Sequence, residues 1–350
     1  MFYINDTVCI SPQNTFSDIN IEILKESENN FLKALEPIYD GLPHNALRRM
    51  SKSVRIALGA SLLLLERNTQ TYEGIIIGSG NGSMEETGKF LDQLIEYNEG
   101  MLTPGNFVQS SPNAIAGQIS LLTKNKNYNI THVHKGLAFE NAMLDVAMLL
   151  KENPSNHYLM GGVDETSSYH YQLDDQEGWY KNETISNNHL YETGSEGSIA
   201  GEGAAMFILS NNKENSLAKL QSFTTVHTSD KQVVKEKIQQ FLSINLPPEE
   251  KIDLFISGEN GDERLLKYYL SCENLLENEI ASVRFKHMSG EYSTASAFAL
   301  WLACNVLGRK ISIPKHCFKN KTSEENYKNI LIYNIYKGEQ HSLMLVKELD

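Results

Sequence analysis

The sequence predicts an α/β protein made of two similar halves. Short runs rich in β-branched and aromatic residues alternate with longer segments whose apolar residues recur at helical spacing. A comparable series begins again after residue 209, and no low-complexity linker separates the two series. We therefore expect an N-terminal half at 1–210 and a C-terminal half at 211–350, packed as one compact unit.

The expected elements of the first half follow the alternating order of a layered α/β fold. The β-rich runs predict strands at 2–10, 74–77, 129–133, 158–160 and 204–209. The periodic segments between them predict helices at 46–65, 84–97, 111–123 and 137–152. The segment 167–198 is rich in Tyr, Asn, Asp and Glu and has little apolar periodicity, which predicts an irregular excursion.

The second half repeats this alternation. We expect strands at 217–226, 253–256, 329–335 and 342–347, and helices at 231–242, 262–273 and 294–307.

Composition excludes several classes of partner. Hydrophobic residues make up 41% of the 350 residues and charged residues 21%, which is ordinary for a globular chain. A net charge of -13 argues against a protein that binds nucleic acid or an anionic membrane surface. No apolar run approaches the roughly 20 residues of a membrane span, so we expect no membrane insertion.

Cysteine and histidine usage predicts a reducing compartment and no metal centre. The N-terminus shows no secretory leader pattern, so we expect a cytoplasmic protein. His132 and His134 alternate on a predicted strand and so face opposite sides, and the other histidines are dispersed along the chain. We expect neither a metal site nor a cofactor. The cysteines, which show no paired spacing, are Cys9, Cys272, Cys304 and Cys317.

The segment 129–140 has the strand-turn-helix pattern with which many acyl-transfer enzymes present a Cys or Ser to their substrate. The turn carries Val133 and His134 instead. Valine cannot attack a thioester carbonyl, and histidine would give only a short-lived acyl-imidazole. Catalytic competence is therefore the central question for this chain.

Three further motifs carry a family resemblance. The runs SPNAIAGQI at 111–119, GGVDETS at 161–167 and GSEGSIAGEGAA at 194–205 occur in this order around the turn. Together they resemble the β-ketoacyl synthase family of the thiolase-like superfamily. The resemblance implies two βαβαβαββ halves that form α-β-α-β-α layers. It also implies a catalytic Cys and two catalytic His, which accept the acyl chain and promote decarboxylation.

None of these three catalytic groups is found at its expected position. The Cys position falls at Val133 or His134, depending on the spacing used. The first His should follow the strand at 253–256, where the chain reads SGENGD and offers Glu259. The family's gating Gly-Phe-Gly-Gly loop is replaced by the sequence NIYKGEQH at 334–341.

The second His belongs to a Lys-x-x-x-Gly-His stretch. Lys286 and Gly290 are retained, but Glu291 replaces the histidine. We expect Glu291 to form an ion pair with Lys286 or His287.

The remaining polar positions have structural explanations. Glu259 and Asp262 can cap the helix expected from 262. Cys304 is expected in the core. His134 and Lys135 either line an acyl pocket or are exposed at the start of the helix.

The runs VHKGLAFE at 133–140 and LRRMSK at 47–52 most resemble the chain-length-factor-like, ketosynthase-like subunits of bacterial aryl polyene and flexirubin pathways. This resemblance implies a pseudoenzyme that forms a heterodimer with an active ketosynthase in type II polyketide or fatty-acid-like biosynthesis. Acyl carrier protein would dock chiefly on the active partner or on a basic patch shared by the two subunits. The expected tunnel-lining residues are Phe107, His134, Phe139 and Met143.

Two alternatives remain open at this point. The chain could be an acyltransferase or decarboxylase that uses His134 with Glu291 or Glu259, which requires the imidazole to face a pocket within reach of a carboxylate. It could instead be a homodimeric fatty-acyl binding protein that needs no ketosynthase partner.

Overall fold

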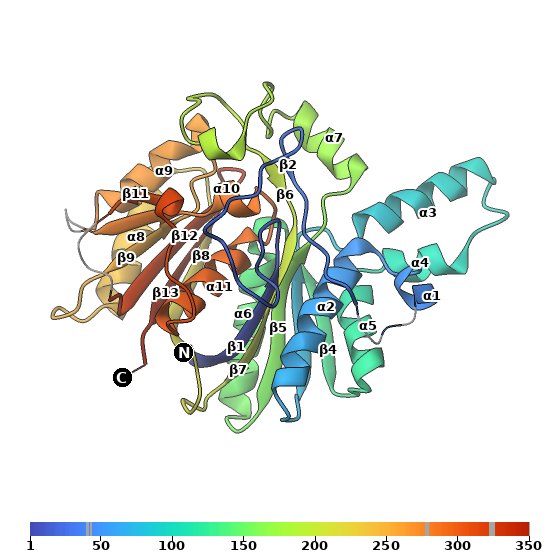
Figure 1. The fold of residues 1–350 in the computed structure, drawn as a ribbon, viewed down its shortest axis with the longest axis horizontal. Coiled ribbons are helices and arrows are strands. Elements are labelled where there is room, and N and C mark those ends of the chain that lie inside the picture. The colour runs from blue at the N-terminus through green and yellow to red at the C-terminus, as the bar shows by residue number, and fades with distance from the viewer. Residues whose placement is uncertain (40–41, 43, 277–279, 322–325, 350) are drawn as a thin grey trace.

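The computed structural model describes residues 1–39, 42, 44–276, 280–321 and 326–349. The described strands form one continuous 11-stranded ladder, which divides between β1 and β8 into two parts with the same strand order, called here the first and the second sheet (Figure 1). The first runs β1-β7-β5-β3-β4 and the second runs β8-β13-β12-β9-β10. If the five strands of each sheet are numbered as they occur in the chain, both sheets have the strand order 1-5-4-2-3. The two halves therefore share one topology. A short antiparallel pairing of β1 with β8 joins the sheets.

The strands of these two sheets agree with the predicted runs to within a few residues, except for two short strands that were not predicted. The first sheet contains β1 (Phe2–Ile10), β3 (Gly74–Ser79), β4 (Tyr128–Val133), β5 (His157–Asp164) and β7 (Gly203–Ser210). The second contains β8 (Ala218–His227), β9 (Leu254–Ser257), β10 (Ala281–Arg284), β12 (Asn329–Tyr336) and β13 (Gln340–Lys347). The two unpredicted strands of these sheets are β10 and β11 (Phe318–Asn320), which lie at the edge of the second sheet. The strands β2 (Phe31–Leu32) and β6 (Ala200–Gly201), which pair with each other apart from these sheets, were not predicted either.

Five layers result from the way helices cover these sheets. Helices α2 (Lys52–Arg67) and α5 (Ala114–Thr123) bury apolar side chains against the outer face of the first sheet. Helices α8 (Lys231–Asn245) and α9 (Glu263–Glu273) cover the outer face of the second. Helices α6 (Ala138–Glu152) and α11 (Ala295–Leu307) belong to the core between the sheets. The layered, thiolase-like α/β fold class is therefore confirmed.

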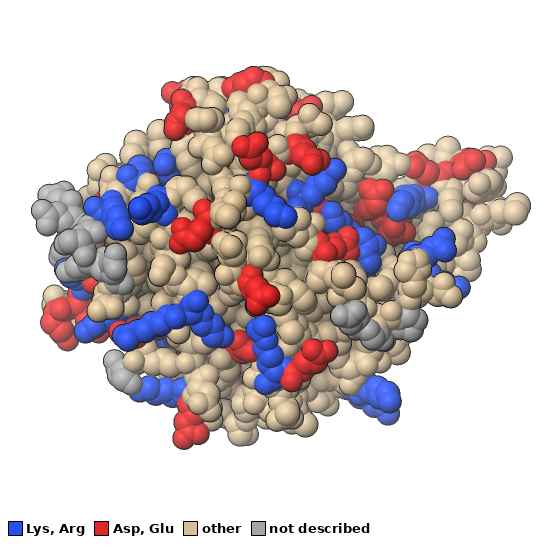
Figure 2. Space-filling view, viewed as in Figure 1, with Lys and Arg blue, Asp and Glu red and all other residues tan. Residues whose placement is uncertain are grey.

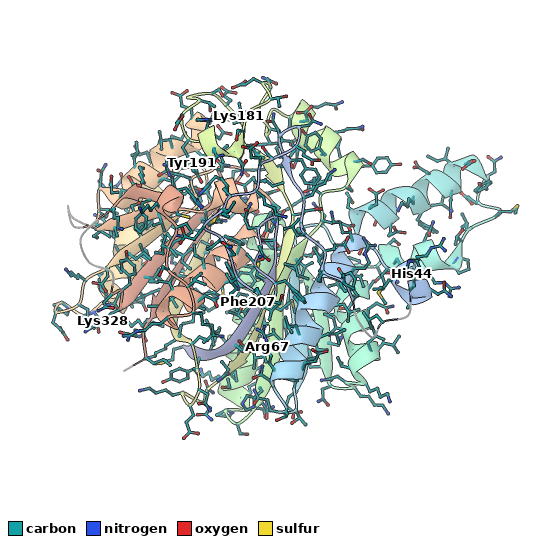
Figure 3. The ribbon with its side chains drawn as sticks, viewed as in Figure 1. His44, Arg67, Lys181, Tyr191, Phe207 and Lys328 are labelled. Carbon is teal, nitrogen blue, oxygen red and sulfur yellow. The ribbon has the colours of Figure 1, made fainter. Side chains whose placement is uncertain are left out.

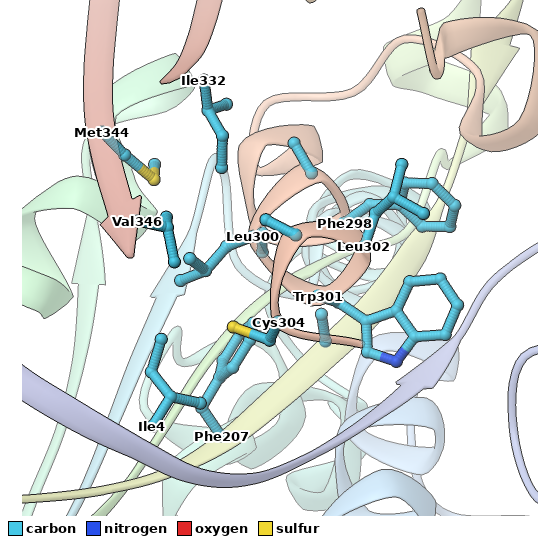
Figure 4. Close-up of a cluster of buried hydrophobic side chains, with 14 of the residues drawn as sticks. Ile4, Phe207, Phe298, Leu300, Trp301, Leu302, Cys304, Ile332, Met344 and Val346 are labelled. Carbon is cyan, nitrogen blue, oxygen red and sulfur yellow. The ribbon is translucent and has the colours of Figure 1, made fainter. Parts of the chain in front are cut away.

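Helix α11 is the centre of this middle layer. Nearly all of its side chains are buried, as expected for a helix that is apolar on every side. Figure 4 shows Phe298 and Trp301 of α11 packed together with Phe207 of β7 and Met344 of β13 nearby. Cys304 lies in the same cluster, so its predicted core position is confirmed.

The shorter elements lie around the ends of the sheets. Helices α3 (Met84–Glu96) and α4 (Pro104–Ser110) extend away from the body as an arm (Figure 1). The other short elements are α1 (His44–Leu47), α7 (Ser168–Gln176), α10 (Lys286–Ser289), the 3-10 turns η1 (Lys135–Leu137), η2 (Asn187–His189) and η3 (Lys315–Cys317), and the strands β2 (Phe31–Leu32) and β6 (Ala200–Gly201).

Local helix capping explains two differences between the expected elements and the structure. The helix predicted at 46–65 is divided into α1 and α2, since the hydroxyl of Ser51 accepts a hydrogen bond from the Val54 amide (3.3 Å) and starts α2. The segment 167–198 was expected to be irregular, yet it contains α7, which Ser167 caps through the His170 amide (3.1 Å). The same segment is anchored by Lys181 (Figure 3), whose ammonium donates to the carbonyl of Gly261 (2.8 Å).

No helix in the described ranges combines the length and apolar character that a bilayer crossing requires. Acidic and basic side chains are interspersed over the face shown in Figure 2.

Candidate functional site

The turn between β4 and α6 has the geometry of a nucleophile elbow. Val133 ends the strand, His134 has φ −155°, and Lys135 has φ 48°. A left-handed conformation is uncommon outside glycine and is characteristic of strained functional turns. The apex of the elbow is therefore Lys135, one residue beyond the two positions considered from the sequence.

Contacts on both sides hold this apex. The Lys135 amide donates to the carbonyl of Gly80 (3.2 Å), and its ammonium donates to the Asn81 side-chain oxygen (2.7 Å). The Gly136 amide donates to the side-chain oxygen of Gln340 (2.8 Å). A Cβ atom on Gly136 would lie 2.1 Å from Tyr336 Cβ, so the end of β12 packs directly on the elbow.

Glu291 forms the ion pair expected with Lys286. The carboxylate accepts from the Lys286 ammonium at 2.7 Å and from the Asn260 amide at 2.8 Å. The Lys286 side chain is fully buried and that of Glu291 is 12% exposed. Burial lowers the pKa of Lys286 and raises the pKa of Glu291, while their mutual attraction opposes both shifts.

The retained Gly290 explains why Glu291 occupies this position. Gly290 has φ 71°, and a Cβ atom there would lie 2.5 Å from Gly201 Cα. Only glycine allows this approach of two backbones. The Glu291 amide can then donate to the Ile199 carbonyl (2.7 Å), which directs the carboxylate toward Lys286.

Glu259 does not cap α9, contrary to expectation. Asp262 alone does so, accepting from the Arg264 amide at 3.0 Å. Glu259 instead pairs with Lys319 (2.6 Å) and Arg284 (3.6 Å), because these cations reach it from β10 and β11. Both glutamates predicted to stand at the family's histidine positions are thus engaged with cations.

Little space remains beside Glu291, whereas Glu259 lines a separate cavity of about 140 Å³. A cavity of about 20 Å³ is lined by residues that include Asp164, Glu291, Tyr336 and Lys337. This is room for roughly one water molecule. Lys337 helps to enclose it through an ion pair with Asp174 (2.6 Å).

Two buried carboxyl groups next to this cavity are strongly perturbed. Burial raises the pKa of Asp164 to about 6, although the carboxyl accepts hydrogen bonds from Gly80 and Thr294. Burial likewise raises the pKa of Glu165 to about 7. Asp164 lies at the end of β5 and ties the elbow side of the molecule to the start of α11.

The four tunnel candidates do not lie together. His134 is exposed, and in the described part of the chain its ring forms no hydrogen bond with a carboxylate. Phe107 on α4 is 63% exposed, with its ring centroid 5.4 Å from that of Phe90. Phe139 and Met143 are fully buried in the middle layer. A tunnel-lining role for these residues stays a prediction, and packing alone accounts for the two in the core.

An unpaired strand edge lies next to the elbow. β4 is the last strand of its sheet, and its partner on the other side is β3. Apolar side chains around this edge are exposed on α4, α5, β4 and α6; they are Phe107, Val108, Leu121, Leu122, Tyr128, Val133, Leu144 and Met148. An open edge with such surroundings is typical of a surface covered by another chain.

The fold also brings together a group that the sequence did not indicate. His287, His316 and Cys317 lie within reach of one another, so the histidines are not all dispersed as expected. The spacing of 29 residues between the two histidines gave no signal of this contact.

A model of the N-terminal domain of beta-ketoacyl synthases matches residues 25–244, more than half of the chain. The chain belongs to the beta-ketoacyl synthase family. The family resemblance carried by the sequence motifs is thus confirmed. A search of curated protein sequences finds no significant match.

Solved structures agree with this assignment at the level of the fold. A beta-ketoacyl synthase from Burkholderia phymatum superimposes with a TM-score of 0.79 at 14% identity, covering 100% of this chain and 99% of that chain. A chain from the complex of a ketosynthase with its chain length factor from Xenorhabdus doucetiae gives 0.78 at 12% identity, with coverages of 99% and 98%. The ishigamide ketosynthase/chain length factor gives 0.77 at 12% identity, with coverages of 100% and 99%.

Proposed function

We propose that this ketosynthase-like protein is a chain-length-factor-like subunit of an aryl polyene or flexirubin type pathway. It pairs with an active β-ketoacyl synthase and does not itself condense acyl units. The observation that carries the proposal is the elbow. Lys135 occupies its apex, preceded by Val133 and His134 and followed by Gly136. None of these side chains is a thiol, and a thiolate is the group that can both accept and release an acyl chain.

The surroundings of the elbow support the same conclusion. The two positions of the catalytic histidines hold Glu291 and Glu259, and each is neutralised by lysine. Neither can act as the imidazole donor that stabilises an enolate oxyanion. The cavity of about 20 Å³ is far smaller than the 300–1,000 Å³, roughly, of an ordinary ligand pocket.

The exposed apolar edge supports the pairing part of the proposal. The edge of β4 presents unpaired backbone groups, and neighbouring helices expose Phe107, Leu121 and Met148. Another chain that continues the sheet would satisfy those groups and bury the apolar surface. Two of the similar folds come from structures described as ketosynthase with chain length factor. A further similar fold comes from a type II acyl-carrier protein in complex with its ketosynthase.

The alternative of an independent acyltransferase or decarboxylase has less support. It needs His134 to face a pocket within reach of Glu291 or Glu259, but His134 is exposed and both glutamates pair with lysines. A homodimeric acyl-binding protein would use the same open edge. Only a measurement of partner choice distinguishes it from the heterodimer.

Acylation is the first test. The purified chain is incubated with acyl carrier protein thioester and examined by intact-protein mass spectrometry, with an active ketosynthase as the positive control. No adduct is expected on this chain. A stable adduct that disappears in Lys135→Met or His134→Gln would overturn the pseudoenzyme proposal.

Association is the second test. Co-expression with the ketosynthase, followed by native mass spectrometry, should give one copy of each chain. Leu144→Glu beside the open edge should weaken the complex, because a charge would be buried at the contact. The matched control is Ile244→Glu, which charges an exposed residue of α8 on the opposite outer layer and should leave the complex intact. Equal effects of the two variants would contradict pairing through this edge.

A further inference from the structure

Three side chains of the kind that bind soft metals converge beneath the surface near α10. His287 lies on α10, while His316 and Cys317 lie on η3. His287 Nε2 is 2.9 Å from His316 Nδ1 and 4.0 Å from Cys317 Sγ, and His316 Nδ1 is 3.6 Å from the same sulfur. His287 and Cys317 are buried, and His316 is partly exposed, which leaves a route from solvent.

These separations fit a tetrahedral metal ion. Zinc bonds of about 2.0–2.1 Å to nitrogen and about 2.3 Å to sulfur give ligand separations of about 3.3 Å for two nitrogens and about 3.6 Å for nitrogen and sulfur. The three observed distances differ from these values by no more than about half an ångström. We propose that His287, His316 and Cys317 bind a single thiophilic metal ion, Zn²⁺ or Cu⁺.

The outer contacts orient both rings for this task. His316 Nε2 lies 3.0 Å from the Ile21 carbonyl, so that nitrogen carries the proton and Nδ1 presents a lone pair to the site. His287 Nδ1 lies 3.0 Å from the hydroxyl of Tyr191, which Figure 3 labels. Hydrogen bonds of this type to the second ring nitrogen are a regular feature of metal-binding histidines.

Without metal, the hydrogen-bond network places a proton between the rings. Since His316 Nδ1 is an acceptor, His287 Nε2 donates to it and His287 Nδ1 accepts from Tyr191. Metal binding would move this proton to Nδ1, which then donates to the Tyr191 oxygen. The Cys317 thiol would lose its proton to solvent, so one proton is released for each ion bound.

A fourth position and the local charge also suit a soft ion. The thioether of Met288 lies 3.8 Å from Cys317 Sγ, close to the separation of two sulfurs on one tetrahedral centre. Thioether ligands favour Cu⁺ over Zn²⁺. The nearby Arg284 guanidinium pairs with Glu259 and lies over the Tyr191 ring. The ion would link α10 to η3 through its ligands, and the hydrogen bond of His316 to the Ile21 carbonyl would connect the segment around Ile21 to the same site.

The test uses the reduced full-length chain and Co²⁺ as a spectroscopic probe for Zn²⁺. One equivalent of Co²⁺ should produce a thiolate-to-metal charge-transfer band, and Zn²⁺ should abolish it. His316→Ala should weaken binding at least about tenfold, and Cys317→Ser should remove the band. The matched control, Cys304→Ser, replaces a buried thiol of α11 and should keep the band. Absence of the band, or its survival in Cys317→Ser, would overturn the proposal.

X-ray absorption on the metal-loaded native chain gives a result that does not depend on the folding of any variant. Zinc should show one sulfur and two imidazole nitrogens. Copper(I) in the native chain should show a second sulfur, contributed by Met288. A shell of oxygen and nitrogen alone would refute the site.

Discussion

The Lys286–Glu291 pair allows a quantitative test of the structural role assigned to the glutamate. Glu291→Gln keeps the side-chain volume but removes the only carboxylate that hydrogen-bonds to the fully buried Lys286 ammonium in the described structure. Lys286→Met removes the opposite charge and retains the apolar stem. The double variant carries both changes and so leaves neither charge.

Breaking one side of a buried ion pair costs about 3–5 kcal/mol, because the remaining charge is uncompensated. An unfolding entropy of about 2.1 cal/mol/K per residue gives roughly 0.7 kcal/mol/K for 350 residues. Each single variant should therefore lower the melting temperature by about 4–7 °C. The double variant should be more stable than either single variant, since it removes both desolvated charges together.

The pH dependence provides a second check on the same pair. In Glu291→Gln the unpaired Lys286 has a folded-state pKa below its unfolded value, so the penalty is present at neutral pH and shrinks as the pH rises toward about 10. Circular dichroism melts between pH 7 and pH 10 measure this. If the double variant is as unstable as the sum of the singles, the two groups do not interact and the reasoning fails.

Three further predictions follow from burial and close contact. Phe107→Ala removes an exposed ring and should change stability by no more than about 0.5 kcal/mol, yet lengthen products in a reconstituted heterodimer. An unchanged distribution of product lengths for Phe107→Ala, with the heterodimer intact, would exclude a length-setting role for Phe107. Phe139→Ala should lower the free energy of unfolding by about 3–5 kcal/mol and lower the yield of all products alike. Glu165, with its pKa raised to about 7, is protonated when folded and ionised when unfolded between about pH 4.5 and 7. Its contribution to the free energy of unfolding is therefore complete below this window and is lost as the pH rises through it. The free energy of unfolding of Glu165→Gln should accordingly rise by up to about 3 kcal/mol relative to that of the native chain between pH 5 and pH 8. Melting temperatures of the two proteins that change in parallel with pH would refute this. Gly136→Ala should displace Tyr336 and lower the melting temperature clearly, because its Cβ would lie 2.1 Å from Tyr336 Cβ; a melting temperature equal to that of the native chain would contradict the contact.

Local sequence pattern was enough for the strands and helices that bury continuous apolar runs. β12 and β13 and the central helix α11 were predicted to within two residues, because each contains a dense run of apolar residues that the fold buries. The four-residue strand β10 was missed because its existence depends on parallel pairing with β9, which lies more than 20 residues earlier. The division between α1 and α2 was also missed, since it depends on one serine cap.

The sequence by itself was enough to predict that the family's catalytic Cys and two His are missing, because that prediction needs only residue identities at motif positions. Only the tertiary structure decided how the residues at those positions are held. It placed Lys135 at the left-handed apex of the elbow and directed Glu291 to Lys286 through the contact of Gly290 with Gly201. It also brought His316 and Cys317 to His287. These contacts join residues that are far apart in the chain and have no common period, so their geometry exists only after the layers have packed.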